Sequence, residues 1–224
     1  MTPALILARH GESEASYRGV LNGVPEAGVG LTREGEAQAR QLGELLRTGS
    51  GGDRTDAGAR EGARDGARAA TRGIPPLVVA TAFPRTQQTA ALAVGRAPDL
   101  LLPGLNDPRF GAWEGRPLEE YRSWALTAPP AEPCPGGGES RTEVAARVAA
   151  AVRELLARPE PVILVVAHSL PLRYLVDAAQ GLVPAARAER MPYAEPFWLD
   201  GAEAAAAAEL LARWAAAPAW RSAA

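Results

Sequence analysis

The stretch VILVVA, residues 162–167, decides the fold class of this chain. It is entirely apolar and mostly β-branched, which is typical of a strand buried on both faces of a parallel sheet. Residues 4–8 and 77–80 are similar apolar runs and predict two more buried strands. Weaker strand patterns lie at residues 100–102 and 192–199. The chain therefore contains the strands of a central sheet.

Helical patterns alternate with these strands. Thr32 is expected to cap a helix whose apolar stripe includes Leu42 and Leu46. Strands that alternate with helices indicate a parallel sheet covered on both faces. We therefore expect an α/β protein with three layers, α/β/α, around a central, mostly parallel sheet. The other helices are expected at about residues 85–94, 142–157, 171–179 and 202–217, whereas residues 103–140 read as rich in loops and proline.

One segment differs from its surroundings. Residues 48–73 mix Arg, Asp, Gly and Ala with almost no large apolar side chain. Such a composition buries too little surface to offset the entropy lost on ordering, so we expect a flexible surface insertion there. No internal repeat is visible, and residues 1–224 are expected to form a single domain that carries this insertion.

The composition excludes several classes of function. The formal net charge is −2, which suggests neither a nucleic-acid surface nor a membrane surface. All 24 basic residues are arginine, so a Walker A lysine and a Schiff-base lysine are both excluded. Cys134 is the only cysteine, which excludes an internal disulfide. No stretch has the roughly 18 apolar residues of a membrane span, and a secretory signal is not expected, so a cytoplasmic protein is the expectation.

Two histidines are the strongest chemical signal. His10 and His168 each follow a predicted buried strand, and ligands of open α/β sheets gather at the carboxyl ends of strands. Both placements thus point to one crevice. Arg9 precedes His10, Arg85 begins the helix after the second strand, and Arg173 lies one turn beyond His168. Because arginine binds phosphate oxygens with a bidentate fork, such a pocket suits a phosphoryl group.

Other site chemistries have no support in the sequence. The chain lacks a Gly-x-Gly-x-x-Gly motif after a strand, a Gly-x-Ser-x-Gly motif and a Cys-x₅-Arg motif. Nucleotide binding, serine hydrolysis and cysteine phosphatase chemistry are therefore not indicated. Adjacent arginines would repel a cation near the histidines, so we expect neither a metal ion nor another cofactor.

Six short motifs, in the right order, resemble the histidine phosphatase superfamily, also called phosphoglycerate mutase-like. The first, LARHGES, looks like the family signature, and a later one resembles its Val-x-His-Gly…Arg motif. Any single match is weak, whereas six in order are specific. The matching segments are residues 7–13, 31–39, 81–90, 105–115, 137–140 and 166–173.

The resemblance implies a mechanism through a phosphohistidine. It makes His10 the nucleophile, and an ordinary imidazole is largely neutral at cytoplasmic pH. Arg9, Arg85 and His168 would surround the phosphoryl oxygens and stabilise charge during transfer. Further contacts to phosphate are expected from two positions where the family often has Asn or Gln, here Ser16 and Asn22.

The resemblance also implies a residue that donates and accepts the proton. By position this residue is Asp107, although the family more often has the longer glutamate there. Glu114 is the fallback, with a structural role as its ordinary reading. Among the remaining residues, Ser13 is expected to cap a helix, Arg147 to lie on a helix surface, and Tyr121 to serve packing.

Three functions stay open from the sequence. The first is a phosphomonoesterase acting on a small phosphorylated metabolite. The second is a phosphoglycerate mutase-type isomerase, but such mutases carry a long, lysine-containing insertion where this chain has only residues 116–136 and no lysine. The third is a non-catalytic binder of phosphate or phosphoprotein, suggested by Asp107 and by Ser169 in place of glycine. Sugar phosphates, ribazole phosphate and phosphoproteins all stay open as ligands, and no feature indicates an oligomeric state.

Overall fold

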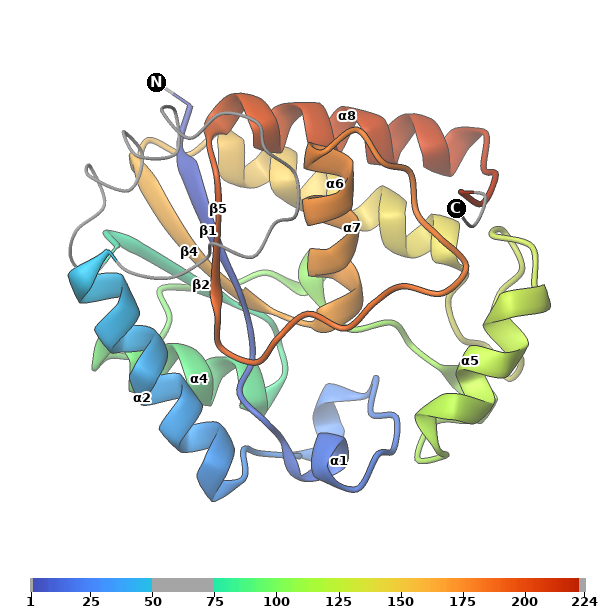
Figure 1. Ribbon diagram of the computed structural model, residues 1–224, viewed down its shortest axis with the longest axis horizontal. Coiled ribbons are helices and arrows are strands. Elements are labelled where there is room, and N and C mark those ends of the chain that lie inside the picture. The colour runs from blue at the N-terminus through green and yellow to red at the C-terminus, as the bar shows by residue number, and fades with distance from the viewer. Residues whose placement is uncertain (1, 50–74, 222–224) are drawn as a thin grey trace.

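The computed structural model describes residues 2–49 and 75–221 (Figure 1). Its sheet has the strand order β3-β2-β4-β1-β5, in which β5 is antiparallel to β1 and every other pair is parallel. The expected mostly parallel sheet is confirmed. The strands are β1 (Ala4–Arg9), β2 (Leu77–Ala80), β3 (Leu100–Leu101), β4 (Val162–Ala167) and β5 (Pro196–Leu199).

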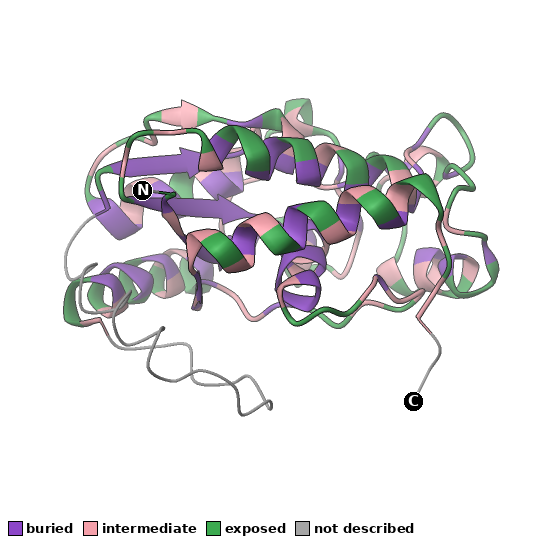
Figure 2. Ribbon diagram, turned by 90° about the horizontal axis from the view of Figure 1, so that it is seen from above, coloured by how far each residue is buried: buried purple, intermediate pink, exposed green. Residues whose placement is uncertain are grey.

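Helices cover both faces of this sheet, which gives the three expected layers (Figure 1). In β1, Leu5 and Leu7 point into a core shared with α6, α7 and α8, whereas Ile6 and Ala8 pack with α2 and α4. The strands β1, β2 and β4 are accordingly buried on both sides, whereas the edge strand β3 is partly exposed. Exposed residues lie largely on the outer helix faces and in loops (Figure 2). The helices are α1 (Glu14–Tyr17), α2 (Arg33–Thr48), α4 (Pro84–Val94), α5 (Leu118–Thr127), α6 (Arg141–Leu156), α7 (Ser169–Ala179) and α8 (Gly201–Ala216).

The cap at the start of α2 is the one expected. The Oγ1 of Thr32 accepts a hydrogen bond from the backbone N–H of Gly35. At its other end the helix continues through Thr48, the first residue of the predicted insertion, and Gly49 follows in the left-handed region. The rest of that prediction, residues 50–73, lies outside the described residues.

The segment expected to be rich in loops contains a helix that the sequence analysis did not predict. α5 begins after Pro117 and buries Tyr121 and Ala125. These two side chains pack with Leu21 and Phe110 in a small third core. The spacing of four between the buried residues is helical, but the surrounding prolines obscure it.

Strand register brings the two histidines together. Arg9 of β1 pairs with Ala167 of β4, so the residues that follow both strands lie side by side. The backbone N–H of His10 donates to the carbonyl of Ala167 at 3.0 Å. The functional side chains therefore meet at the carboxyl edge of the parallel strands, as the sequence predicts. Over residues 2–49 and 75–221, no helix has both the length and the apolarity needed to cross a membrane.

Candidate active site

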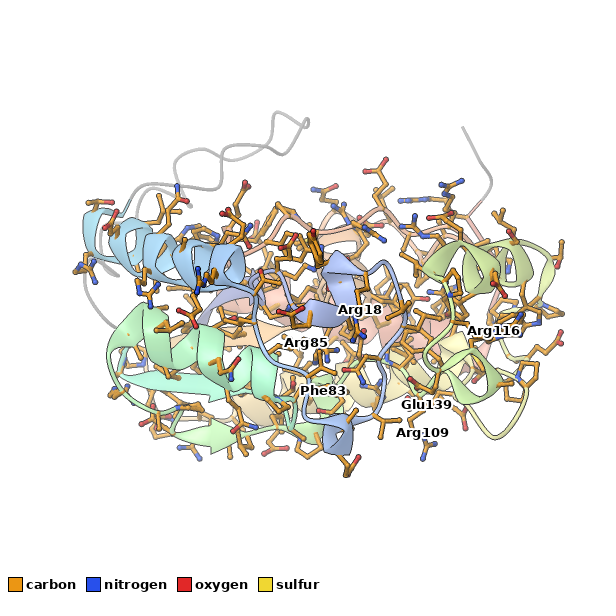
Figure 3. All side chains as sticks on the ribbon, turned by 90° about the horizontal axis from the view of Figure 1, so that it is seen from below. Arg18, Phe83, Arg85, Arg109, Arg116 and Glu139 are labelled. Carbon is orange, nitrogen blue, oxygen red and sulfur yellow. The ribbon has the colours of Figure 1, made fainter. Side chains whose placement is uncertain are left out.

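A cavity of about 130 Å³ opens at this edge of the sheet. Arg85 lies deep in the molecule beside the ring of Phe83, with its guanidinium carbon 4.2 Å from the ring centre (Figure 3). Most of the residues expected in the site line the cavity, but His168 and Glu114 are not among them. The expected residues that do line it are Arg9, His10, Ser16, Asn22, Arg85 and Asp107.

His10 is buried and held as a neutral imidazole. Its Nδ1 lies 2.7 Å from the carbonyl oxygen of Gly11, which can only accept, so Nδ1 carries the hydrogen. The lone pair on Nε2 accepts from Nε of Arg85 at 3.2 Å. Burial, together with the charges of Arg85 and Arg9, lowers the pKa of His10 well below its ordinary value. The side chain thus presents an unprotonated Nε2.

His168 is fully buried behind His10. The two rings meet edge to face with centroids 5.3 Å apart. The Nδ1 of His168 accepts from Nη2 of Arg85 at 3.2 Å, so its Nε2 carries the hydrogen that faces Oγ1 of Thr81 at 2.9 Å. Burial and the charge of Arg85 lower the pKa of His168 well below its ordinary value. The site therefore contains two neutral imidazoles.

Arg85 connects the groups of the site. Besides both histidines, it donates to Oδ1 of Asn22 at 2.6 Å and to the Asn22 carbonyl at 3.0 Å. Its Nη2 also lies 3.3 Å from Oδ2 of Asp107. Burial lowers the pKa of Arg85, and the Asp107 carboxyl opposes that effect. Its position as the second residue of α4 aims the guanidinium at the carboxyl edge of the sheet.

Asp107 lies close to His168 and to Arg85. Its Oδ2 is 3.8 Å from Nδ1 of His168, and the side chain is 20% exposed. Burial raises the pKa of this carboxyl, while Arg85, Arg9 and Arg147 lower it by a smaller amount. A carboxyl with a raised pKa is suited to donate a proton and then take one back.

Arg147 does not lie on the helix surface that the sequence analysis expected. Its Nη1 donates to the carbonyls of Gly104 at 2.9 Å and Asn106 at 2.8 Å. Its Nε donates to Oε1 of Glu139 at 2.8 Å. The side chain is half-buried and holds the loop that carries Asp107. Local periodicity could not reveal this role, because it depends on a loop that packs on α6 from elsewhere in the chain.

Glu114, the fallback acid, has its carboxylate engaged by backbone groups. Its Oε2 accepts from the N–H of Gly23 at 2.8 Å and its Oε1 from the N–H of Phe110 at 2.9 Å. These bonds join the loop around residue 23 to the loop after Asp107. The geometry therefore gives Glu114 a bridging position and leaves Asp107 as the carboxyl beside the histidines.

Arg9 is held by residues that the sequence analysis did not single out. Its Nη1 donates to the carbonyl of Met191 at 2.8 Å, and its guanidinium carbon lies 3.8 Å from the ring centre of Tyr193. Its Nε is buried without a partner among the described residues. Both contacts come from the segment that leads into β5. The sequence analysis found no motif in that segment. A short β-bridge between Arg9 and Tyr193 places it beside Arg9.

Ser13 caps a helix as expected, and Ser16 lines the cavity. The Oγ of Ser13 caps α1 by accepting from the N–H of Ser16 at 3.3 Å, and it donates to Oγ of Ser16 at 3.0 Å.

The part of the chain that the structure describes contains no group of three His, Cys, Asp or Glu side chains able to hold a metal ion. The cavity also has four basic lining residues that the sequence analysis did not predict, which are Arg122, Arg141, Arg187 and Arg190.

Several solved structures resemble this chain. The alpha-ribazole phosphatase of Shigella flexneri is 25% identical over 88% of this chain and 90% of its own, with a TM-score of 0.65. The protein TTHB049 of Thermus thermophilus is 28% identical over 88% of this chain and 93% of its own, with a TM-score of 0.59. A mycobacterial glucosyl-3-phosphoglycerate phosphatase, 24% identical over 88% and 92% with a TM-score of 0.63, shows the shared fold alone.

No curated protein matches the chain. The family model of the histidine phosphatase superfamily, branch 1, matches residues 5–54 and 53–211. The match includes both histidines, both central arginines and Asp107. The chain therefore belongs to the histidine phosphatase superfamily.

Proposed function

We propose that the protein is a phosphomonoesterase that cleaves a small organic phosphate through a phosphohistidine on His10. One observation carries the proposal. The Nδ1–H of His10 is bonded to the Gly11 carbonyl, which leaves the Nε2 lone pair facing Arg85 in the cavity. Such an arrangement suits nucleophilic attack on phosphorus.

In the first step, Nε2 of His10 attacks phosphorus in line with the ester oxygen. The N–P bond forms as the P–O bond to the leaving group breaks. Asp107, in the protonated form that burial favours by raising its pKa, gives its proton to the departing alkoxide. Arg85 transfers its hydrogen bonds to the phosphoryl oxygens, and Arg9 stabilises the same charge. His168 orients Arg85 by accepting a hydrogen bond from its Nη2.

In the second step, water releases the phosphate. The Asp107 carboxylate takes a proton from the water, whose oxygen attacks phosphorus as the N–P bond breaks. The products are orthophosphate, neutral His10 and protonated Asp107, so the cycle closes. The alpha-ribazole phosphatase of Shigella flexneri supports release to water rather than retransfer within the substrate.

Catalysis is proposed to need no metal ion. Arg9 and Arg85 supply the positive charge that a cation supplies in many phosphatases. Turnover is therefore expected to persist in EDTA. Activity that disappears in EDTA and returns with Mg²⁺ would show that the arginines alone are insufficient.

A trapping experiment tests the proposal. Protein mixed with ³²P-labelled phenyl phosphate and quenched in alkali is expected to carry an acid-labile label. The label is expected to be absent in His10→Ala and present in the exposed-surface variant Arg40→Gln, which serves as the control. Turnover without any trapped label, or label that persists in His10→Ala, would overturn the mechanism. Transfer back to the product alcohol in place of release would indicate a mutase.

A further inference from the structure

Arg141 is a buried cation that the proposed chemistry does not use. It is 7% exposed and begins α6. Its Nη1 donates to the hydroxyl of Tyr174 at 3.1 Å and its Nη2 to the carbonyl of Ala186 at 3.3 Å. Its Nε is buried without a partner, and within residues 2–49 and 75–221 it forms no ion pair with a carboxylate. A buried charge without a counter-ion is costly unless an anionic ligand supplies one.

Arg141 lines the same cavity as His10. Arg187 and Arg190 line it too, are exposed, and form no ion pair within the described residues. Both belong to the segment between α7 and β5, which runs toward α5 before it turns back (Figure 1). Among the described residues that line this side of the cavity, Glu189 is the single acidic one, beside Arg141, Arg187 and Arg190, so this side carries a net positive charge.

The wall beside Arg141 is partly apolar. The guanidinium carbon lies 5.4 Å from the ring centre of Tyr121, which also lines the cavity. Leu170 lines the same space. A single water needs roughly 10–15 Å³ of such volume, so a cavity of about 130 Å³ accommodates far more than a phosphoryl group.

Resting on the proposed function, we propose that Arg141, with Arg187 and Arg190, forms a second anion subsite. It binds a negatively charged group on the leaving part of the substrate, while Tyr121 contacts the apolar body between the two anions. The substrate class is therefore an organic phosphate with a second anionic group. A carboxylate and a phosphate share the required chemistry.

Binding of phosphonates that cannot be hydrolysed tests the subsite without turnover. The three ligands are benzylphosphonate, 4-carboxybenzylphosphonate and 4-(phosphonomethyl)benzylphosphonate, each titrated by calorimetry. Charge-assisted hydrogen bonds predict that at least one of the two ligands with a second anionic group binds roughly 10- to 100-fold more tightly than benzylphosphonate. The tighter ligand identifies the second group as carboxylate or phosphate. Equal binding of all three would overturn the proposal.

Variants then locate the preference. In Arg141→Gln, the ratio of the dissociation constant of benzylphosphonate to that of the tightest of the other two ligands is expected to shrink to about threefold or less. Arg141→Lys is expected to restore part of this ratio. The matched control is Arg153→Gln, which removes an exposed arginine from the same helix and is expected to keep the full ratio. An unchanged ratio in Arg141→Gln would overturn the proposal. If circular dichroism shows that this variant does not fold, the double variant Arg187→Gln with Arg190→Gln decides, with a reduced ratio for the proposal and an unchanged one against it.

Turnover separates this inference from the proposed function. The kcat/KM for 4-carboxyphenyl or 4-phosphonophenyl phosphate is expected to exceed that for phenyl phosphate by a similar factor. Phosphonate preference without any hydrolysis would support the subsite and overturn the phosphatase. Hydrolysis without a preference for the second anionic group in either assay would support the phosphatase and overturn the subsite.

Discussion

Two opposing effects act on the pKa of a single residue, Asp107. Burial favours its neutral form, and the nearby guanidinium of Arg85 favours its charged form. The balance raises the pKa, so the group can begin the cycle with a proton. The carboxyl is one methylene shorter than glutamate, and the loop held by Arg147 carries it to within 3.8 Å of His168.

Replacing this carboxyl should matter most when the leaving group is a strong base. An alkyl phosphate leaves as a basic alkoxide, whereas p-nitrophenolate hardly needs a proton. General acid catalysis typically contributes 10²- to 10⁴-fold, so Asp107→Asn is expected to lose about that much on glycerol 3-phosphate. The loss on p-nitrophenyl phosphate should be much smaller. Single-turnover kinetics are required, because release of phosphate also needs the carboxylate.

The matched control is Glu114→Gln. This change weakens the bonds that Glu114 accepts from Gly23 and Phe110 without touching the histidines. Both substrates should slow by a similar factor, if they slow at all. A selective loss on the alkyl ester in Glu114→Gln would mean that Asp107 has been assigned the wrong role.

The pH profile of kcat/KM should be displaced toward acid. His10 must be neutral to attack, and its lowered pKa keeps it neutral below the ordinary range of histidine. Asp107 must be protonated, and its raised pKa keeps it so above the ordinary range of a carboxyl. Activity on an alkyl phosphate should fall as pH rises through the Asp107 pKa. Ionisation of the substrate affects the unchanged protein and the Asp107→Asn variant alike. If activity falls equally steeply with rising pH in Asp107→Asn, the assignment of this limb to Asp107 is wrong.

At the scale of elements, α2 and α4 approach closely at Gly43. A Cβ there would lie 2.2 Å from the backbone carbonyl oxygen of Ala93. Alanine in place of glycine normally stabilises a helix by about 1 kcal/mol. Overpacking against backbone costs about 1–3 kcal/mol, so Gly43→Ala should be net destabilising. Urea unfolding measures the difference, and exposed Gln41→Ala in the same helix should change stability by less than about 0.5 kcal/mol. A more stable Gly43→Ala would show that the helices separate freely.

Strands were predictable from sequence to a greater degree than the walls of the cavity. An apolar run such as residues 162–167 predicts a buried strand, and the residue after it is therefore expected at the edge of the sheet. Arg141 and Arg147 carry no such local signal. Both lie on one helix, and their partners are Tyr174, Ala186, Gly104 and Asn106, which come from distant segments. The role of each arginine is decided by tertiary packing.

For the whole molecule, the two buried histidines should make stability depend on pH. The unfolded chain takes up protons on both near pH ~6.5, whereas the folded chain resists them because both pKa values are lowered. The unfolded state therefore binds more protons below this pH. Stability should fall as pH drops from about 6.5 to 5, by up to about 1.4 kcal/mol per unit for each histidine.

Urea unfolding at pH 7, 6 and 5 measures this slope. Asp107 acts in the opposite direction, because its raised pKa makes the folded state hold an extra proton. The Asp107→Asn background removes that contribution and should steepen the slope. A stability that is flat between pH 7 and 5 in this background would mean that the histidines are protonated in the folded protein.

The pairing of Arg9 with Ala167 has a consequence for the order of folding. It joins the first strand to one that lies far along the chain, at residues 162–167, and such non-local contacts form slowly. Helices such as α6 and α8 can form early, since their contacts are local. His10 and His168 face each other only after β1 has docked beside β4. During refolding, catalytic competence should therefore return with the slowest spectroscopic phase and lag behind the recovery of helical signal.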